Sequence, residues 1–217
     1  MRPLTKNNLK HFYFNKYFVT PFKQKRYPIS YCYHYKAIWF RTYKVASRTI
    51  HHLLKENSPE KSYIYSSPVS YQPDRYKDFF KFTFVRNPLD RFFSIWKGMV
   101  LKRNYFEFPE SEYQKMKDFQ NFLDWVESKN FTNADIHLVP QHKLIDTDHV
   151  DFVGRFENFE EDLLKVADEI NLPVEKSNLV HRNKSPRKEL SIEEKDRERI
   201  LRLYQKDVEL FYPHLEF

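Results

Sequence analysis

Glycine and cysteine are almost missing from this chain of 217 residues, which contains two glycines and one cysteine. With only Gly98 and Gly154 available, a glycine-rich loop that wraps the phosphates of a nucleotide cannot form, and the pattern GxxxxGK[ST] does not occur. Cys32 has no second cysteine with which to form an intramolecular disulfide. This fits a reducing compartment, or a fold that needs no disulfides, and we expect a cytoplasmic protein.

Long apolar runs and metal-binding patterns are absent as well. The longest apolar stretch near the start, HFYFNKYFV, is interrupted by Asn15 and Lys16 and is far shorter than the about 20 apolar residues of a membrane span. We therefore expect neither a signal peptide nor a membrane anchor. The nine histidines show no HExxH spacing, and a single cysteine excludes CxxC, so we expect no metal site.

The composition is that of a folded protein with a basic surface. Apolar residues make up 41% and aromatic residues 18%, which excludes a disordered chain, and the length suits one domain spanning 1–217. The net charge of +7 indicates a polyanionic ligand, a phosphorylated cofactor or nucleic acid, although a basic surface can also be only solubilising. Because most aromatic residues fall in strand and helix patterns, we expect them in the core and expect no nucleic acid partner.

Strands and helices alternate along the chain. Four apolar or β-branched stretches predict strands at 37–40, 62–65, 80–85 and 149–156. Helices are expected from Ser47, from Pro88, around 119–126, over 158–172, and from Ser191 to Phe211. This alternation predicts an α/β fold with a central, mostly parallel sheet flanked by helices. Residues 1–30 are aromatic and basic without a clean period, and we expect a partly ordered N-terminal arm.

Three helices have recognisable start signals. Asn87 is placed as an N-cap, Pro88 occupies the first helical position, and Asp90 lies in the first turn. Capping-box spacing also marks the helices that begin at Asn158, with Glu161, and at Ser191, with Glu194.

Two loops at expected strand ends carry chemistry suited to anions. In the stretch FRTYKVASRTIHHLL, Lys44 stands on the loop, and Ser47, Arg48 and Thr49 fall in the first turn of a helix, where backbone N–H groups attract negative charge. In FVRNPLDRFFS, Arg86 ends a strand and Ser94 follows about 9 Å along the next helix. These positions could bind two separate anionic groups.

At this point the sequence resembles a known family. YKVAS resembles the loop that holds the 5'-phosphosulfate in sulfotransferases using 3'-phosphoadenosine 5'-phosphosulfate (PAPS), and FTFVRNPLDRFFSIW is similar to their 3'-phosphate element. HLVPQ followed by VDFVGRFENFEEDL, NKS at 183–185, and LYQKDVELFYP at 203–213 look like the carbohydrate sulfotransferase branch and its bacterial relatives. The resemblance runs from about residue 37 to the C-terminus and implies a single P-loop-like domain.

The resemblance also implies an activity and a set of site residues. The enzyme would transfer a sulfuryl group in line from PAPS to a hydroxyl of a carbohydrate or similar acceptor, without a metal. Lys44 would neutralise charge on the leaving phosphate. The donor-binding residues carried over are Lys44, Val45, Ala46, Ser47, Arg48, Thr49, Arg86 and Ser94.

The catalytic base is less clearly marked. Many relatives place a histidine between the lysine loop and the arginine strand, but residues 53–85 contain none. His137, in the family-like HLVPQ segment, is the first candidate. Glu56, His51 and His52 are the alternatives.

Other interpretations remain open at this stage. A P-loop-type kinase is disfavoured by the missing GxxxxGK[ST] pattern, and a basic nucleic-acid-binding module is the non-enzymatic alternative. Residues 97–133 are the least family-like, and we expect this insertion to shape the acceptor pocket, with Tyr105, Phe106 and Phe108 as stacking surfaces for a sugar. The sequence does not indicate an oligomeric state.

Overall fold

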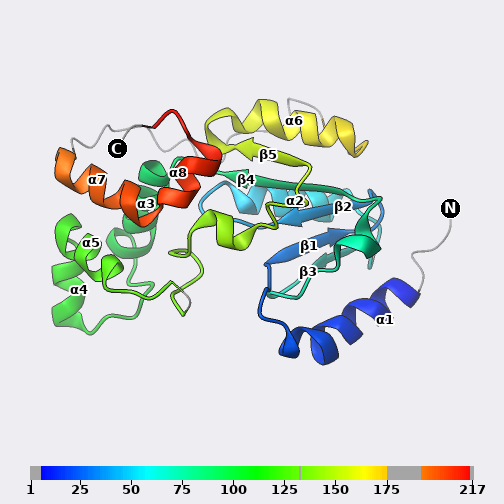
Figure 1. Cartoon of the computed structure of the whole chain (residues 1–217), viewed down its shortest axis with the longest axis horizontal. Coiled ribbons are helices and arrows are strands. Elements are labelled where there is room, and N and C mark those ends of the chain that lie inside the picture. The colour runs from blue at the N-terminus through cyan, green and yellow to red at the C-terminus, as the bar shows by residue number, and fades with distance from the viewer. Residues whose placement is uncertain (1–5, 132, 175–191, 216–217) are drawn as a thin grey trace. The chain divides into compact units, whose positions relative to one another are not determined.

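A computed structural model describes residues 6–131, 133–174 and 192–215 of the chain (Figure 1). The chain divides into two compact units that alternate along the sequence. Unit 1 comprises Met1–Thr42, Ala46–Val85 and Lys143–Arg182, and unit 2 comprises Tyr43–Val45, Arg86–His142 and Asn183–Phe217. The prediction of one domain over 1–217 stays a prediction.

Unit 1 is built around a five-stranded sheet with the order β3-β1-β2-β4-β5. The strands are β1 (Ile29–Cys32), β2 (Ala37–Phe40), β3 (Tyr63–Tyr65), β4 (Phe80–Val85) and β5 (Phe152–Arg155). Strands β2, β4 and β5 pair in parallel, whereas β1 pairs antiparallel with both β2 and β3. Within this sheet β1 therefore runs against the other strands. The predicted α/β fold with a mostly parallel central sheet is confirmed.

The strand predictions succeed where burial is complete. Strands β2 and β4 have the predicted bounds, and every residue of β2 is buried, which is why its sequence is an unbroken apolar run. The predictions at 62–65 and 149–156 were too long, because β3 covers Tyr63–Tyr65 and β5 covers Phe152–Arg155. Strand β1 was not predicted, since it begins within the aromatic and basic stretch that was assigned to the arm.

Helices accompany the sheet in unit 1. They are α1 (Lys6–Phe14), the π-helical turn η1 (Asn15–Val19), the 3-10 turn η2 (Thr20–Phe22), α2 (Ser47–Glu56), the 3-10 turns η3 (Pro73–Tyr76) and η6 (Phe156–Asn158), and α6 (Phe159–Glu169). Helix α2 buries Ile50 and Leu54, as its period predicted. Helix α6 packs beside β5 (Figure 1).

The start of α6 differs from the prediction in one respect. Asn158 occupies the N-cap position, but its side chain makes no capping hydrogen bond, so the expected capping box is not formed. The 3-10 turn η6 precedes the helix directly and changes the backbone geometry at this point. Asp162 in the first turn instead accepts a hydrogen bond from the backbone N of Arg155 at 2.8 Å, which joins the helix start to the end of β5.

Unit 2 consists of helices around an apolar core. They are α3 (Pro88–Ile95), the π-helical η4 (Trp96–Leu101), α4 (Glu110–Met116), α5 (Phe119–Glu127), α7 (Glu194–Leu203) and α8 (Gln205–Phe211), while the 3-10 turn η5 (Gln141–Leu144) leads into unit 1. Fully buried core members include Phe92, Phe122 and Ile200. Helix α3 begins as predicted: Asn87 accepts a hydrogen bond from the backbone N of Leu89 at 2.9 Å.

The C-terminal helix was expected to be continuous but is broken in two. Helix α7 ends at Leu203 and α8 begins at Gln205. At the break the buried Tyr204 donates a hydrogen bond from its hydroxyl to the carbonyl of Leu138 at 3.0 Å, a contact that no helix periodicity could reveal. The predicted start at Ser191 lies outside the described residues, as does the family-like NKS at 183–185.

The 97–133 segment contributes to the core of unit 2 through its aromatic residues. Phe106 and Phe108 lie against the ring of Trp125, at centroid distances of 5.1 Å and 4.8 Å. Phe108 is buried, so the expectation that it offers a stacking surface to a sugar is wrong. Its ring is used for packing. The role of this segment in shaping an acceptor pocket stays a prediction.

Candidate active site

The lysine loop achieves its turn without glycine by adopting left-handed backbone conformations at two other residues. Lys44 has a φ of 70° and Ala46 a φ of 59°. Such conformations cost an L-residue of order 1–3 kcal/mol and are concentrated at functional sites. Ala46 is also the N-cap of α2, and its methyl side chain cannot accept a hydrogen bond from the first turn. The N-terminus of α2 is therefore left without a side-chain cap, as an anion site requires.

Polar contacts within unit 1 fix the first turn of α2. The hydroxyl of Ser47 donates to the carbonyl of Thr42 at 2.8 Å. The hydroxyl of Thr42 in turn donates to the carbonyl of Phe84 in β4. The single hydroxyl hydrogen of Ser47 is used in this hydrogen bond. The backbone N–H groups at the start of the helix are therefore better placed to donate hydrogen bonds to an anion.

In unit 2, Lys44 and Arg86 are joined directly. The guanidinium of Arg86 donates from Nη1 to the carbonyl of Lys44 at 3.2 Å. The side chain of Lys44 extends to Gly98 in η4, where a Cβ atom would come within 2.9 Å of Nζ. The absence of a side chain at Gly98 thus gives the Lys44 ammonium its room. The sequence alone gave no indication that Gly98 makes room for this ammonium.

Arg91 is a further residue of this region that the sequence reasoning missed. It is almost completely buried, and its Nη2 donates to the carbonyls of His137 at 2.7 Å and Val139 at 2.8 Å. Its Nε donates to the carbonyl of Tyr43 at 3.4 Å. One guanidinium therefore connects the lysine loop to the His137 segment. An available signal was the position of Arg91 between Pro88 and Ile95, on the apolar face of α3.

His137 is oriented by a carboxylate. Its Nδ1 lies 2.8 Å from Oδ1 of Asp135, and its backbone N donates to the same oxygen at 2.9 Å. The edges of Tyr43 and Tyr105 pack on its ring, with centroid distances of 4.7 Å and 5.2 Å. Because an ionised Asp135 can only accept a hydrogen bond, Nδ1 carries the hydrogen, and the lone pair of a neutral His137 is on Nε2. In that state Nε2 is the nitrogen of the ring that can accept a hydrogen bond.

The charge state of Asp135 supports this arrangement. Burial acts to raise the pKa of its carboxyl, but the hydrogen bonds from the side chain and backbone of His137 outweigh it. The pKa of Asp135 is consequently held below its ordinary value. Tyr105 adds a third hydrogen bond, from its hydroxyl to Oδ2 at 3.3 Å. Asp135 is therefore ionised at neutral pH and can fix the tautomer of His137.

Gln141 joins the HLVPQ segment to the backbone of Arg86, the residue that follows β4. Its side-chain Oε1 accepts from the backbone N of Arg86 and its Nε2 donates to the carbonyl of the same residue, both at 2.9 Å. The backbone N atoms of Gln141 and His142 donate to the fully buried Asp207 in α8, which also lies 2.7 Å from Nδ1 of His142. Gln141 thereby fixes the backbone at Arg86, although sequence reasoning gave it no role.

The remaining candidates are Ser94 in unit 2 and His51, His52 and Glu56 in unit 1. Ser94 lies in the last turn of α3 and is partly exposed, and its pairing with Arg86 around an anion stays a prediction. In unit 1, Nδ1 of His51 pairs with the hydroxyl of Tyr63 at 3.0 Å, and His52 pairs with Glu56 at 2.9 Å. Burial, and then the charge of Lys55, lower the pKa of His51. Glu56 is in the last turn of α2, at the opposite end from its N-terminus.

Neither a metal-binding cluster nor a membrane-spanning helix occurs among the described residues. In that part of the chain, no group of three or more His, Cys, Asp or Glu side chains is arranged to hold a metal ion. None of the described helices has the length and apolar character to cross a membrane. The expectation of metal-free chemistry stays a prediction.

Comparison with known proteins bears on the same residues. A family model described as the sulfotransferase family matches residues 27–213, a range that contains the whole sheet and every site residue named above. No curated protein and no solved structure matched the chain. The chain belongs to the sulfotransferase family, and it is a transferase whose reaction is the transfer of a sulfuryl group.

Proposed function

We propose that this sulfotransferase uses PAPS as its donor and a hydroxyl of a carbohydrate or similar molecule as its acceptor. The observation that carries the proposal is the cluster in unit 2: the carboxylate-oriented His137 packs on Tyr43, and the next residue, Lys44, is hydrogen-bonded to Arg86. The candidate base thus contacts the residue before Lys44, and the guanidinium of Arg86 contacts the backbone carbonyl of Lys44. Such a set of residues suits sulfuryl transfer from an anionic donor to a hydroxyl acceptor.

The side chains present suit a bisphosphorylated, sulfated nucleotide. In unit 2, Lys44 and Arg86 supply positive charge. In unit 1, Arg48 carries a further positive charge and the start of α2 supplies uncapped backbone N–H groups. We assign Lys44, Val45, Ala46, Ser47, Arg48 and Thr49 to the 5'-phosphosulfate, and Arg86 with Ser94 to the 3'-phosphate. Gly98 supports this fit, because a Cβ there would crowd the ammonium that has to approach the 5' group.

Each residue has a defined part in the chemistry. The donor supplies an activated sulfuryl group, whose bond to a phosphate oxygen breaks as a bond from the acceptor oxygen to sulfur forms. His137 takes the acceptor proton on Nε2, since Nδ1 is engaged by Asp135. Lys44 neutralises the charge that develops on the leaving phosphate oxygen. The chain's own side chains account for both charges that change, so the proposal includes no metal.

The proposal also extends to compartment and partners. The single cysteine, Cys32, is buried in β1 and burial raises the pKa of its thiol, so it is a poor nucleophile for disulfide exchange. We propose a cytoplasmic enzyme that acts without nucleic acid and without a membrane-spanning anchor. Because the chain belongs to the sulfotransferase family, we prefer this function to a P-loop-type kinase or a nucleic-acid-binding module.

Donor recognition is tested by calorimetric titration without Mg²⁺. We expect 3',5'-adenosine bisphosphate to bind more tightly than 5'-AMP, because Arg86 gains a charge-assisted contact with the 3'-phosphate. Arg86→Ala should remove most of this difference, whereas Arg202→Ala, an exposed arginine on α7 paired with Glu198, should not. Equal affinity of the wild-type protein for both nucleotides would contradict the assignment of the 3' site.

A further inference from the structure

The N-terminal helix of unit 1 is attached to the rest of the unit along one side. Phe12 is buried and its ring packs edge-on against Tyr31 of β1, with 5.8 Å between centroids. Asn15 exchanges hydrogen bonds with Ser70, donating to its carbonyl at 2.9 Å and accepting from its hydroxyl at 2.8 Å. Thr20 accepts a hydrogen bond from the backbone N of Ser70 at 3.0 Å. These contacts fix which side of α1, η1 and η2 faces outward.

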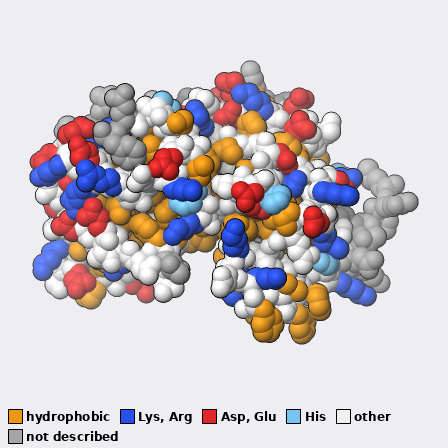
Figure 2. All heavy atoms as spheres, in the orientation of Figure 1, with side chains coloured by type: hydrophobic (Ala, Val, Ile, Leu, Met, Phe, Trp, Pro, Cys, Tyr) orange, Lys and Arg blue, Asp and Glu red, His pale blue; other side chains and the backbone are white. Residues whose placement is uncertain are grey.

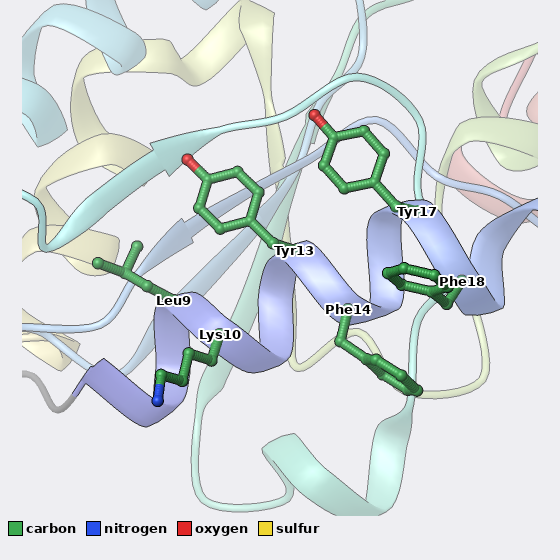
Figure 3. A pocket seen from close by; sticks show the side chains of 6 residues that line it. All are labelled: Leu9, Lys10, Tyr13, Phe14, Tyr17 and Phe18. Atoms are coloured by element: carbon green, nitrogen blue, oxygen red, sulfur yellow. The ribbon is translucent and has the colours of Figure 1, made fainter.

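The outward side carries a dense group of aromatic rings. Five of them, between 50% and 86% exposed, are Tyr13, Phe14, Tyr17, Phe18 and Phe22, which we call the aromatic face. Space-filling atoms show apolar side chains gathered over this helix (Figure 2). The close view shows Tyr13 and Tyr17 projecting side by side, with Phe14 on another flank (Figure 3). An apolar surface of this density on a single helix indicates an interaction site.

The charges within the segment that carries the aromatic face have one sign, although Asp74 of η3 lines the same surface hollow as Lys23 and Lys25. No Asp or Glu occurs anywhere in residues 1–55, and the first acidic residue is Glu56. Lys10 lines the aromatic face together with these rings, and Lys16 lies over the ring of Tyr17 at 5.3 Å. Lys23, Lys25 and Arg26 follow directly and are exposed. A partner for this surface therefore needs an apolar phase next to negative charge.

The arrangement of the rings distinguishes between possible partners. Tyr13 stacks on Tyr17 with 6.3 Å between centroids, and Phe14 stacks on Phe18 with 5.5 Å. Rings that already stack on each other offer fewer free faces to nucleic acid bases, which bind by stacking. A second copy of the chain is also disfavoured, because a two-fold interface would bring the same lysines together. Hydrocarbon beneath anionic headgroups satisfies both the rings and the charges.

We propose that the aromatic face and its flanking lysines form an interfacial helix that binds the surface of a lipid bilayer rich in anionic headgroups. The helix would lie in the plane of the membrane, with the phenylalanines below the headgroups and the lysines among them. Tyrosine suits the boundary, since its ring is apolar and its hydroxyl stays hydrated. Such a helix holds the enzyme at a membrane without spanning it. The proposal does not depend on the donor, the acceptor or the catalytic residues.

Vesicle sedimentation with the full chain tests the proposal. We expect binding to phosphatidylcholine vesicles that contain about 30 mol% phosphatidylglycerol, little binding to pure phosphatidylcholine, and weaker binding as salt is raised. Phe14→Ser combined with Phe18→Ser should lower the partition coefficient by at least about tenfold, because two apolar side chains no longer enter the bilayer. Lys10→Gln and Lys16→Gln should each lower it by roughly fivefold on anionic vesicles only.

Controls separate membrane binding from unfolding and from other partners. Leu210→Ser removes a side chain of similar exposure on α8 and should leave vesicle binding unchanged. Far-UV circular dichroism of the Phe14→Ser, Phe18→Ser variant should match that of the wild type, since both rings are exposed. The proposal is overturned if the wild type binds neither vesicle or if the double variant binds as well as the wild type. It is equally overturned if sedimentation equilibrium shows a dimer that the double variant abolishes.

Discussion

Replacing Gly98 by alanine should separate the position of the Lys44 ammonium from the stability of the fold. The new Cβ would lie 2.9 Å from Nζ of Lys44, whereas ordinary contacts begin at 3.4 Å, so the ammonium has to retreat by about half an ångström. Nζ is the end of a flexible side chain and can move. Gly98 has no positive φ, so alanine fits its backbone without strain. The main structural effect of the substitution is therefore a displacement of the Lys44 ammonium.

The magnitude follows from these distances. Displacing a catalytic group by about 1 Å can cost roughly a hundredfold in rate, so we expect kcat of Gly98→Ala to fall by about tenfold to a hundredfold. Stability should stay the same or rise by about 0.5–1 kcal/mol, because alanine is the better helix former in η4. This corresponds to an increase in melting temperature of about 1 to 4 °C. Activity and stability should thus change in opposite directions.

The assay pairs sulfuryl transfer to the best acceptor of a glycan panel with differential scanning calorimetry. Gly154→Ala is the matched control, because its Cβ would meet three ring atoms of Phe84 at 2.6 to 2.9 Å inside the sheet of unit 1. Overpacking of this kind costs about 1–3 kcal/mol, so the control should lose stability. Full kcat in Gly98→Ala would show that activity does not depend on the room that Gly98 gives Lys44. A melting temperature well below that of the wild type would show that alanine does not fit this position.

Four further predictions concern the neighbouring residues. Arg86→Ala should weaken binding of 3',5'-adenosine bisphosphate by about 1–3 kcal/mol and leave 5'-AMP binding nearly unchanged, as calorimetry can show; an equal loss for both nucleotides would contradict it. His137→Asn should lower kcat by about 10²–10⁴-fold and leave donor binding nearly unchanged, because asparagine cannot take the acceptor proton, and a full rate would exclude His137 as the base. Asp135→Asn should lower kcat by about tenfold to a hundredfold with the KM for the donor unchanged, because only the orientation of the imidazole is lost, and a full rate would show that the carboxylate is dispensable. Gln141→Leu leaves the backbone N and carbonyl of Arg86 without their partner, so it should lower the melting temperature and the bisphosphate affinity together; an unaltered affinity would show that Arg86 does not depend on it.

Local patterns predicted those parts of the fold that depend on local burial and helix starts. Strands β2 and β4 were recognisable because each is a run of buried apolar residues, and α3 because Asn87 caps it. Strand β1 was missed because its place in the sheet depends on pairing with β2 and β3, which composition does not encode. The break at Tyr204 was missed for a similar reason, since it coincides with a hydrogen bond to Leu138, 66 residues away.

The candidate site likewise contains residues that sequence motifs predicted and residues that only the folded structure reveals. Short motifs predicted Lys44, Arg86 and His137, because they contain residue types suited to anions and proton transfer. The residues that hold them in place are Arg91, Asp135 and Gln141, and each acts through contacts that sequence alone does not specify. Arg91 binds carbonyls 46 and 48 residues away, and Gln141 brackets the backbone of a residue 55 positions earlier. Such long-range contacts arise only once the chain has folded.

The central claim is that Lys44 and His137 serve transfer of a sulfuryl group from PAPS to a hydroxyl. Radiolabelled donor, incubated with the wild-type chain and a panel of glycans without metal, measures this directly. We expect label on a glycan hydroxyl with the wild type and none above background with Lys44→Ala, although Lys44→Ala keeps the circular dichroism spectrum of the wild type. A wild-type chain that transfers no label to any hydroxyl, or a Lys44→Ala variant that transfers it at the full rate, would contradict the account.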